Sequence, residues 1–329
     1  MNRTLLALAV TAALAVPLTA QAAPTVYGLL NLSLDMVDEE STLTDQFQVN
    51  SNSSRLGVKG EEDLGNGYSA VYKAEWGVSG DTAGVGDLVG RDRYIGLKAG
   101  WGTVKLGAFD SPLKTSQGKV DQFNDMAFSD MQSYAWGENR QDNVIGYESP
   151  KIADAITIKA TLQAGESNAN DGFAEAISAS VTYEVDNLYL SAAMDKDVNN
   201  SANPYSAVPG NGRDAIRLTG VLTMGDLQLG AMLQTSENSE DSLGQDDETV
   251  MLVSAGYNMG KHTFKGQIAL TNDDFGGGAE TDRTFIAVGY DHNFTQMTKA
   301  FAQLSRMNVD TGAADFDDTI LSVGMQTKF

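Results

Sequence analysis

Hydrophobic and polar residues alternate with a period of two along most of the chain, beginning at Val26. In the first run, Leu30 and Leu34 share the face of Val26, whereas Asn31 and Asp35 lie on the opposite face. Successive side chains of a β-strand point to opposite faces, so each run predicts a strand with one apolar and one polar face. Sixteen such runs predict strands over residues 25–37, 53–62, 67–77, 92–99, 102–109, 143–150, 155–164, 175–185, 188–194, 215–224, 227–234, 249–259, 262–271, 283–293, 298–308 and 319–329.

The connections between these strands alternate in length. The short ones contain the Gly, Asn and Asp residues of tight hairpins and lie at 62–67, 100–101, 186–187, 225–226, 260–261 and 294–295. The long ones lie at 38–52, 78–91, 110–142, 165–174, 195–214, 235–248, 272–282 and 309–318. An even strand count, with short turns at one end and long loops at the other, is typical of a transmembrane barrel. The predicted fold is therefore an all-β transmembrane antiparallel β-barrel of sixteen strands with short periplasmic turns and long extracellular loops.

The apolar faces suit lipid better than the interior of a soluble protein. After the N-terminal segment, no run approaches the roughly 18 consecutive apolar residues of a transmembrane helix. Barrel strands do not contain such long apolar runs, because only every second residue meets lipid. Aromatic residues such as Tyr68, Trp101 and Phe294 fall near predicted strand ends, where rings favour the membrane interfaces. Core packing in a soluble protein would not explain the polar face opposite nearly every apolar one.

Residues 1–22 predict a secretory signal peptide. Arg3 supplies a positive charge, Leu5 to Val16 form an apolar run, and Ala20-Gln21-Ala22 is a small-x-small cleavage site. The alternative is an N-terminal membrane anchor, but the apolar run is short for a span. We therefore expect export, cleavage after Ala22 and a barrel over residues 23–329.

Composition and charge exclude several classes of function. The 329 residues include no Cys, which excludes a disulfide framework and thiol chemistry. The net charge of -22 argues against nucleic acid as a partner, because phosphate binding needs a basic footprint. The long connections hold 31 of the 44 acidic residues. Such an acidic rim could bind divalent cations that bridge lipid head groups, or it could simply keep the extracellular loops solvated; the sequence leaves both open.

Four segments of the chain stand out: SRLGVKGEEDLG at 54–65, RDRYIGLK at 91–98, GTVKLG at 102–107 followed by Asp110-Ser111-Pro112, and RQDNVIGYESP at 140–150. In this order and spacing they resemble the general Gram-negative porins, the trimeric sixteen-stranded diffusion channels of the outer membrane. The resemblance implies a homotrimer surrounded by outer-membrane lipid and lipopolysaccharide, with small hydrophilic solutes and ions diffusing passively through a water-filled lumen. It also implies that barrel-assembly machinery recognises the terminal Phe329. The third loop, about 110–142, is expected to fold into the lumen as a constriction. It lacks the PEFGG sequence of enteric porins, so the family's loop tip cannot be transferred residue by residue.

The resemblance implies a basic ladder on the channel wall that faces acids of the third loop. Strand parity places basic side chains inward at Arg55, Lys59, Lys73, Arg91, Arg93 and Lys105. The loop offers counter-charges at Asp110, Asp121, Asp125, Asp130 and Glu138. Opposed charges would create a transverse field that selects small polar solutes by size and charge. Alternatively, these pairs only hold the loop in place. Ion preference stays open, because the rim is acidic whereas the constriction cluster is basic.

Other functions of a barrel fit less well. An enzyme would need a nucleophile and a base, but His262 and His292 lie at predicted periplasmic turns, away from any convergent Ser and carboxylate. We therefore predict no enzyme, no cofactor and no catalytic metal. A substrate-specific channel for sugars, oligosaccharides or anions would show a continuous aromatic track or an Arg ladder, and neither is clear. A structural or adhesive barrel is a further alternative.

Overall fold

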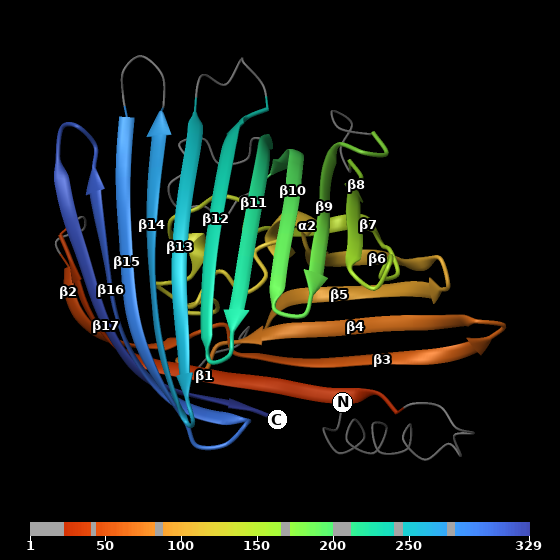
Figure 1. Cartoon of the computed structure of the whole chain (residues 1–329), viewed down its shortest axis with the longest axis horizontal. Coiled ribbons are helices and arrows are strands. Elements are labelled where there is room, and N and C mark those ends of the chain that lie inside the picture. The colour runs from red at the N-terminus through yellow and green to blue at the C-terminus, as the bar shows by residue number, and fades with distance from the viewer. Residues whose placement is uncertain are drawn as a thin grey trace, which may run out of the picture.

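One antiparallel sheet closes on itself to form a barrel (Figure 1). The computed structural model describes residues 23–40, 44–82, 88–165, 172–199, 212–239, 246–274 and 280–329, so the expected signal peptide lies outside the described residues. Closure joins the first and last strands, with Leu34 opposite Val323. The strands are β1 (Thr25–Glu39), β2 (Thr44–Ser51), β3 (Arg55–Gly65), β4 (Tyr68–Val78), β5 (Leu88–Ala99), β6 (Gly102–Asp110), β7 (Arg140–Glu148), β8 (Ile156–Gln163), β9 (Ala176–Val185), β10 (Leu188–Asn199), β11 (Gly212–Met224), β12 (Leu227–Asn238), β13 (Asp247–Met259), β14 (His262–Asp274), β15 (Glu280–Asn293), β16 (Thr298–Asp310) and β17 (Asp315–Lys328).

The second strand of the barrel is interrupted. Both β2 and β3 pair with β1, so they occupy one position in the wall and the barrel has the sixteen strands that the alternation predicts. Between them, Ser53 has a φ of 51°, which turns the backbone out of the ladder. The Asn52 N–H still donates to the Asn31 carbonyl at 2.7 Å. The interruption therefore leaves the side chain of Asn52 available on the inner side of the wall.

Several strands continue beyond the predicted ends on the long-loop side. The expected first loop at 38–52 is wrong in most of its length, because β1 runs to Glu39 and β2 begins at Thr44. Likewise, β10 reaches Asn199 and β17 begins at Asp315. Above the membrane both faces of a strand meet water, so the apolar alternation ends while the backbone ladder continues.

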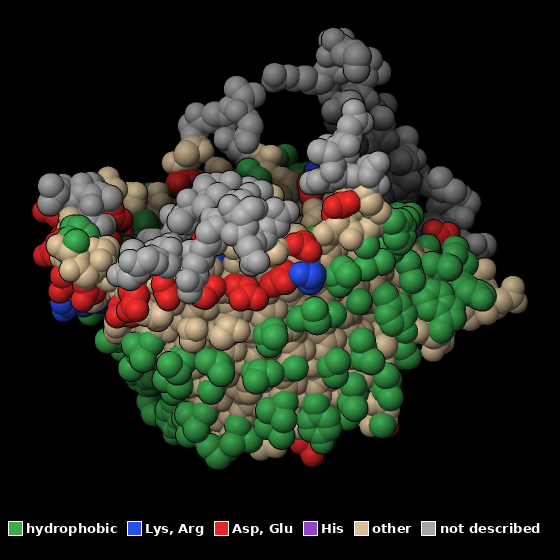
Figure 2. All heavy atoms as spheres, turned by 90° about the horizontal axis from the view of Figure 1, so that it is seen from above, with side chains coloured by type: hydrophobic (Ala, Val, Ile, Leu, Met, Phe, Trp, Pro, Cys, Tyr) green, Lys and Arg blue, Asp and Glu red, His purple; other side chains and the backbone are tan. Residues whose placement is uncertain are grey.

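The outer wall carries the apolar faces. Leu34, Ile95 and Val253 point outward and are more than half exposed, as lipid-facing side chains should be. Figure 2 shows a broad apolar band on the outer wall and, above it, a row of acidic side chains at its margin. No helix in the described part of the chain is both long and apolar enough to cross a membrane.

Residues 111–139 connect β6 to β7 and fold into the barrel. The segment contains helix α2 (Pro112–Thr115), whose first turn is capped by Ser111, and the 3-10 helix η1 (Met131–Ser133), capped by Asp130. Both caps use a side-chain oxygen that accepts a backbone N–H, which satisfies donors that a short helix leaves open. The expected folding of the third loop into the lumen is confirmed.

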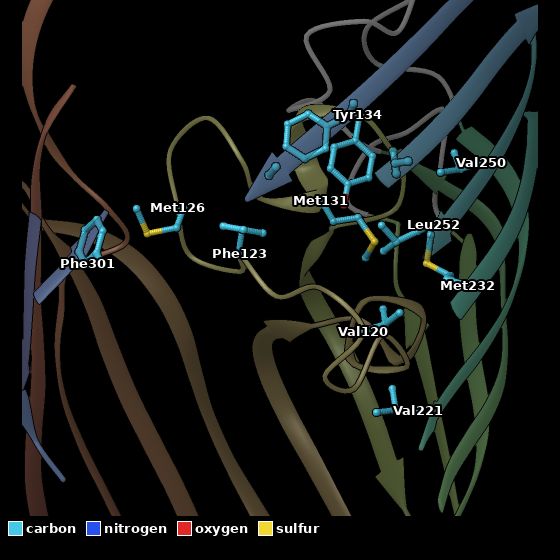
Figure 3. Close-up of a cluster of buried hydrophobic side chains, with 14 residues drawn as sticks. Val120, Phe123, Met126, Met131, Tyr134, Val221, Met232, Val250, Leu252 and Phe301 are labelled. Carbon is cyan, nitrogen blue, oxygen red and sulfur yellow. The ribbon is translucent and has the colours of Figure 1, made fainter. Parts of the chain in front are cut away.

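The hydrophobic core lies between this loop and the inner wall, rather than in a filled barrel (Figure 3). Phe123, Met131 and Tyr134 of the loop pack with inward-facing residues such as Leu252 and Phe285, all nearly inaccessible to solvent. The Tyr134 and Phe285 rings stack with centroids 4.7 Å apart. Apolar side chains can face the lumen here because the loop shields them from water.

Candidate functional site: the channel constriction

Arg217 on β11 fixes the two ends of the third loop to the wall. Its guanidinium donates to the Leu113 carbonyl at 3.2 Å, the Trp136 carbonyl at 3.3 Å and the Glu138 carboxylate at 2.8 Å. The Nε atom donates to Gln234 Oε1 at 2.7 Å. Because Arg217 is fully buried, this charge is stable only while Glu138 stays beside it.

The middle of the loop is held by amide and hydroxyl side chains of the neighbouring strands. Gln234 Nε2 donates to the Trp136 carbonyl at 2.7 Å, and Thr271 Oγ1 donates to the Tyr134 carbonyl at 2.9 Å. Gln267 donates to the Tyr134 hydroxyl at 3.1 Å and accepts the Gln122 backbone N–H at 2.9 Å. Irregular backbone inside a barrel needs such partners, because a buried unpaired amide is costly.

The loop tip crosses to the interruption in the second strand. There the Ala127 N–H donates to Asn52 Oδ1 at 3.0 Å, and the Arg55 guanidinium forms an ion pair with Asp125 at 2.8 Å. Asp125 has a φ of 69°, and its backbone N–H donates to Asp130 at 2.9 Å. The loop tip is thus hydrogen-bonded and ion-paired to the opposite wall at the gap between β2 and β3.

A polar cavity of about 540 Å³ remains between the loop and the wall formed by β3, β4 and β5. Its basic lining residues are Arg55, Lys73, Arg91, Lys114 and Arg140. Its acidic lining residues are Glu75, Asp92, Asp110, Asp125, Asp130 and Glu138. The cavity therefore brings together three of the six predicted wall residues and four of the five predicted loop acids.

The wall of this cavity alternates in charge and is not the purely basic strip that the resemblance implies. Arg91 pairs with Glu75 at 2.7 Å, and Lys73 pairs with Asp92 at 2.9 Å. Arg140 extends the chain of pairs by lying 2.8 Å from Asp92. Glu75 shares the inward parity of Lys73, so the sequence contains a signal for it. Asp92 shares the inward parity of Tyr94 and Gly96, opposite the exposed Ile95 and Leu97, so the sequence contains a signal for it as well. A bulge in β5 then brings Arg91 to the same side.

That bulge also corrects the prediction for Arg93. The register between β4 and β5 shifts between Ala74 and Trp76, so Arg91 and Asp92 both lie opposite Glu75. Arg93 then pairs with Ala74 and shares the face of Ile95, which is exposed on the outer wall. The prediction that Arg93 points into the channel is wrong, since one extra residue in a strand reverses the parity of the residues on one side of it.

Lys59 and Lys105 lie nearer the short-turn end of the barrel and do not line the main cavity. Lys59 is exposed, with its Nζ atom 5.2 Å from the centre of the Tyr27 ring. Lys105 pairs with Glu148 at 3.3 Å and lies 5.1 Å from the centre of the Phe109 ring.

The loop acids divide into two groups. Asp121 is buried, and its two carboxylate oxygens accept the Phe123 N–H at 2.8 Å and the Met131 N–H at 2.9 Å. Burial, together with the nearby Asp130, raises the pKa of Asp121 to about 7. Burial also raises the pKa of Asp130 and of Glu138, in the latter case against the effect of Arg217.

Asp110 and Asp125 form the second group and contact cationic groups at the edge of the cavity. Asp110 lies 2.8 Å from Arg140, and Asp125 lies 2.8 Å from Arg55. The loop acids thus organise the loop or pair with the wall. Within the described residues, no three acidic or histidine side chains form a group that could hold a metal ion.

Comparisons with known proteins agree with this geometry. The family model described as Gram-negative porin matches residues 7–312. Major outer membrane protein P.IB of Neisseria gonorrhoeae is 25% identical over 374 residues, which cover all of both chains. The anion-selective porin from Comamonas acidovorans has a TM-score of 0.77 at 19% identity, covering 93% of this chain and 99% of that one. The trimer form of OmpT from Vibrio cholerae has a TM-score of 0.71 at 18% identity, covering 94% of this chain and 100% of that one.

Proposed function

The chain belongs to the Gram-negative porin family and forms a general diffusion channel of the outer membrane, and we propose that the cavity between the third loop and β3–β5 selects its solutes. The channel is non-enzymatic. The observation that carries the proposal is the connected series of ion pairs along this cavity, from Arg91 through Glu75, Lys73 and Asp92 to Arg140. The pair of Arg55 and Asp125 lines the same cavity separately. Small hydrophilic solutes and ions pass here by size and charge.

The alternating charges favour polar solutes without a strong preference for one ion sign. Each basic group in the cavity lies beside an acid, so the field consists of short local dipoles rather than one uniform potential. A dipolar solute can exchange its hydration for these groups, whereas an apolar solute cannot. The acidic extracellular strand ends then give a weak cation preference by raising the local cation concentration. Fold likeness alone does not transfer the anion selectivity named for the Comamonas protein.

The biogenesis and assembly of the channel follow from the same family membership. We infer that residues 1–22 are removed on export, that three copies assemble as in the trimer form of OmpT, and that barrel-assembly machinery binds Phe329. Support for the last point comes from the chain end. The Phe329 N–H donates to the Gly28 carbonyl at 3.1 Å, while its side chain is 57% exposed on the outer face.

Liposome swelling with a graded series of sugars tests the proposed general channel. Uptake should fall smoothly as sugar size increases, because a polar cavity without a dedicated binding surface discriminates by width. A single sugar or anion that enters much faster than its size predicts would instead identify a substrate-specific channel.

A further inference from the structure

The two histidines of the chain lie directly opposite each other at the short-turn end of the barrel. His262 is the first residue of β14 and pairs with His292 of β15, and the centroids of their rings are 5.1 Å apart. His262 shares the face of Phe264, which is exposed on the outer wall. Both imidazoles therefore lie outside the lumen, and the channel does not use them.

The backbone of the sheet brings the two imidazoles close together. The Asn293 N–H donates to the Lys261 carbonyl at 2.7 Å, so these two residues form a hydrogen-bonded pair of the ladder. His262 and His292 are then the adjacent non-hydrogen-bonded pair, in which opposite side chains approach more closely. Two imidazoles bound to one tetrahedral metal at about 2.0–2.1 Å have ring centres about 5 Å apart. The observed separation meets this requirement without movement of the strands.

Tyr290 holds one nitrogen of His262. The Nδ1 atom of His262 lies 2.7 Å from the Tyr290 hydroxyl, and the two rings stack with their centroids 5.8 Å apart. Metal-binding histidines commonly donate the N–H of one ring nitrogen to a neighbouring oxygen, and the lone pair is then on the other nitrogen. This contact therefore leaves Nε2 as the nitrogen with which His262 can bind a ligand.

A methionine extends the row of histidines. Met259 is the last residue of β13, is exposed, and pairs with His262 across the two-residue turn Gly260-Lys261. Residues that pair across antiparallel strands share a face of the sheet, so the thioether and both imidazoles lie on one side. A thioether is a soft ligand that favours Cu(I), whereas imidazole suits both copper and zinc.

We propose that Met259, His262 and His292 form a Cu(I) site on the outer face of the short-turn end. The thioether determines the choice of metal, because two imidazoles alone would suit zinc as well. The Phe294 ring packs edge-on against His292 at 4.8 Å, so one side of the site is apolar, as suits a singly charged metal ion. This inference requires only a folded barrel and does not depend on how the channel selects solutes.

Competition with a coloured chelator measures the site in the folded channel. The protein in detergent micelles is titrated with Cu(I) under argon, with ascorbate as the reductant and bicinchoninate as the competitor. We expect one Cu(I) per chain. H292Q and M259L each remove a ligand and should weaken binding at least about 100-fold, whereas Y290F removes only the orienting hydroxyl and should weaken it about tenfold.

M224L is the matched control for M259L. Met224 is also an exposed methionine that ends a strand at a two-residue turn, but it pairs with Leu227 and not with a histidine. M224L should therefore leave the Cu(I) affinity unchanged. X-ray absorption at the copper edge adds a readout that does not depend on affinity, since scattering from sulfur should be present in the wild type and M224L and lost in M259L.

Single-channel conductance shows whether the variants are folded. All of them should conduct like the wild type, because the site lies outside the lumen, so a failed copper result does not affect the proposed channel. The proposal is overturned if the wild type does not retain Cu(I) against the chelator. Equal Cu(I) affinity in M259L and the wild type, or copper–sulfur scattering that persists in M259L, would also contradict it, because the thioether of Met259 would then not be a ligand.

Discussion

Arg55 on β3 and Asp125 at the tip of the third loop form an ion pair of 2.8 Å across the channel. The pair lies beside the hydrogen bond from the Ala127 N–H to Asn52, so charge and backbone contacts hold the tip at one place. Both side chains are about one-quarter exposed or less, and they line the constriction cavity. The same pair therefore closes the loop onto the wall and contributes to the field that ions meet.

Replacing Arg55 with Gln should shift the channel toward cations. The variant R55Q removes one positive charge from the lining and leaves Asp125 without its partner, so the cavity becomes more negative. The reversal potential in a planar bilayer under a KCl gradient measures this directly. R306Q, on the outer wall, should leave the reversal potential unchanged, and a shift of R55Q toward anions would contradict the assignment.

Deleting residues 118–132 should widen the channel. These residues carry the loop tip and most of the apolar contacts with β11–β16, so their loss opens the lumen while it exposes Leu252 and Phe285 to water. Conductance should rise, and sugars excluded from the wild type should enter liposomes. Unchanged conductance would show that the loop does not limit the pore. The newly exposed apolar surface should also lower the Tm of the barrel.

Breaking the buried pair of Arg217 and Glu138 should be more harmful than breaking an exposed one. The variant R217M leaves Glu138 as an uncompensated buried charge, which costs about 3–5 kcal/mol. The double variant R217M/E138Q should recover part of this loss, because it removes the orphaned charge. The half-exposed pair of Lys151 and Glu184, 3.8 Å apart, is the control, and K151Q should cost about 0–1 kcal/mol. Thermal unfolding compares the wild type with the three variants, and equal Tm shifts for R217M and K151Q would contradict the burial argument.

Loop docking should weaken as pH rises from about 4 to about 7. The pKa of Asp121 is about 7 in the folded loop and lies near 4 when the group is exposed, so the folded form retains its proton more strongly. The resulting stabilisation is fully present below pH 4 and is lost as pH approaches 7. The raised pKa values of Asp130 and Glu138 act in the same direction.

Open-channel noise at pH 5 and pH 8 is the measurement for this prediction. Noise should be larger at pH 8, and D121N, which cannot ionise, should show a smaller difference between the two conditions. D142N provides the control, because Asp142 is an exposed residue at the start of β7. If the noise differed between pH 5 and pH 8 by the same amount in D121N and D142N, ionisation of Asp121 would not be the cause.

The alternation of side chains predicts the barrel well because lipid and water impose opposite demands on the two faces. The alternation disappears where both faces of a strand meet water. The sequence therefore predicts a loop at the residues that form β2. The alternation also fails at the bulge in β5, since nothing local marks the extra residue that lets Arg91 and Asp92 both face the lumen while Arg93 faces outward. Parity correctly directs Glu75 into the lumen.

The inward apolar residues could not be understood from single strands. Leu252 and Phe285 face the lumen because a segment more than 100 positions earlier in the chain covers them. Likewise, the importance of Asn52 depends on where the loop tip lands. These contacts between the loop and distant strands can be identified only from the three-dimensional arrangement of the strands around the barrel.

The placement of the hydrophobic cluster imposes an order on assembly. Phe123 and Met126 pack in a cluster that includes Phe301 of β16, and Gln303 of the same strand donates to Ser129 at 3.2 Å. These contacts cannot form until the last strands have joined the sheet. A barrel that still lacks β16 therefore lacks these contacts of the loop tip, although β11 to β14 already offer partners to the rest of the loop. The tip reaches its final position only when the last strands have joined the sheet.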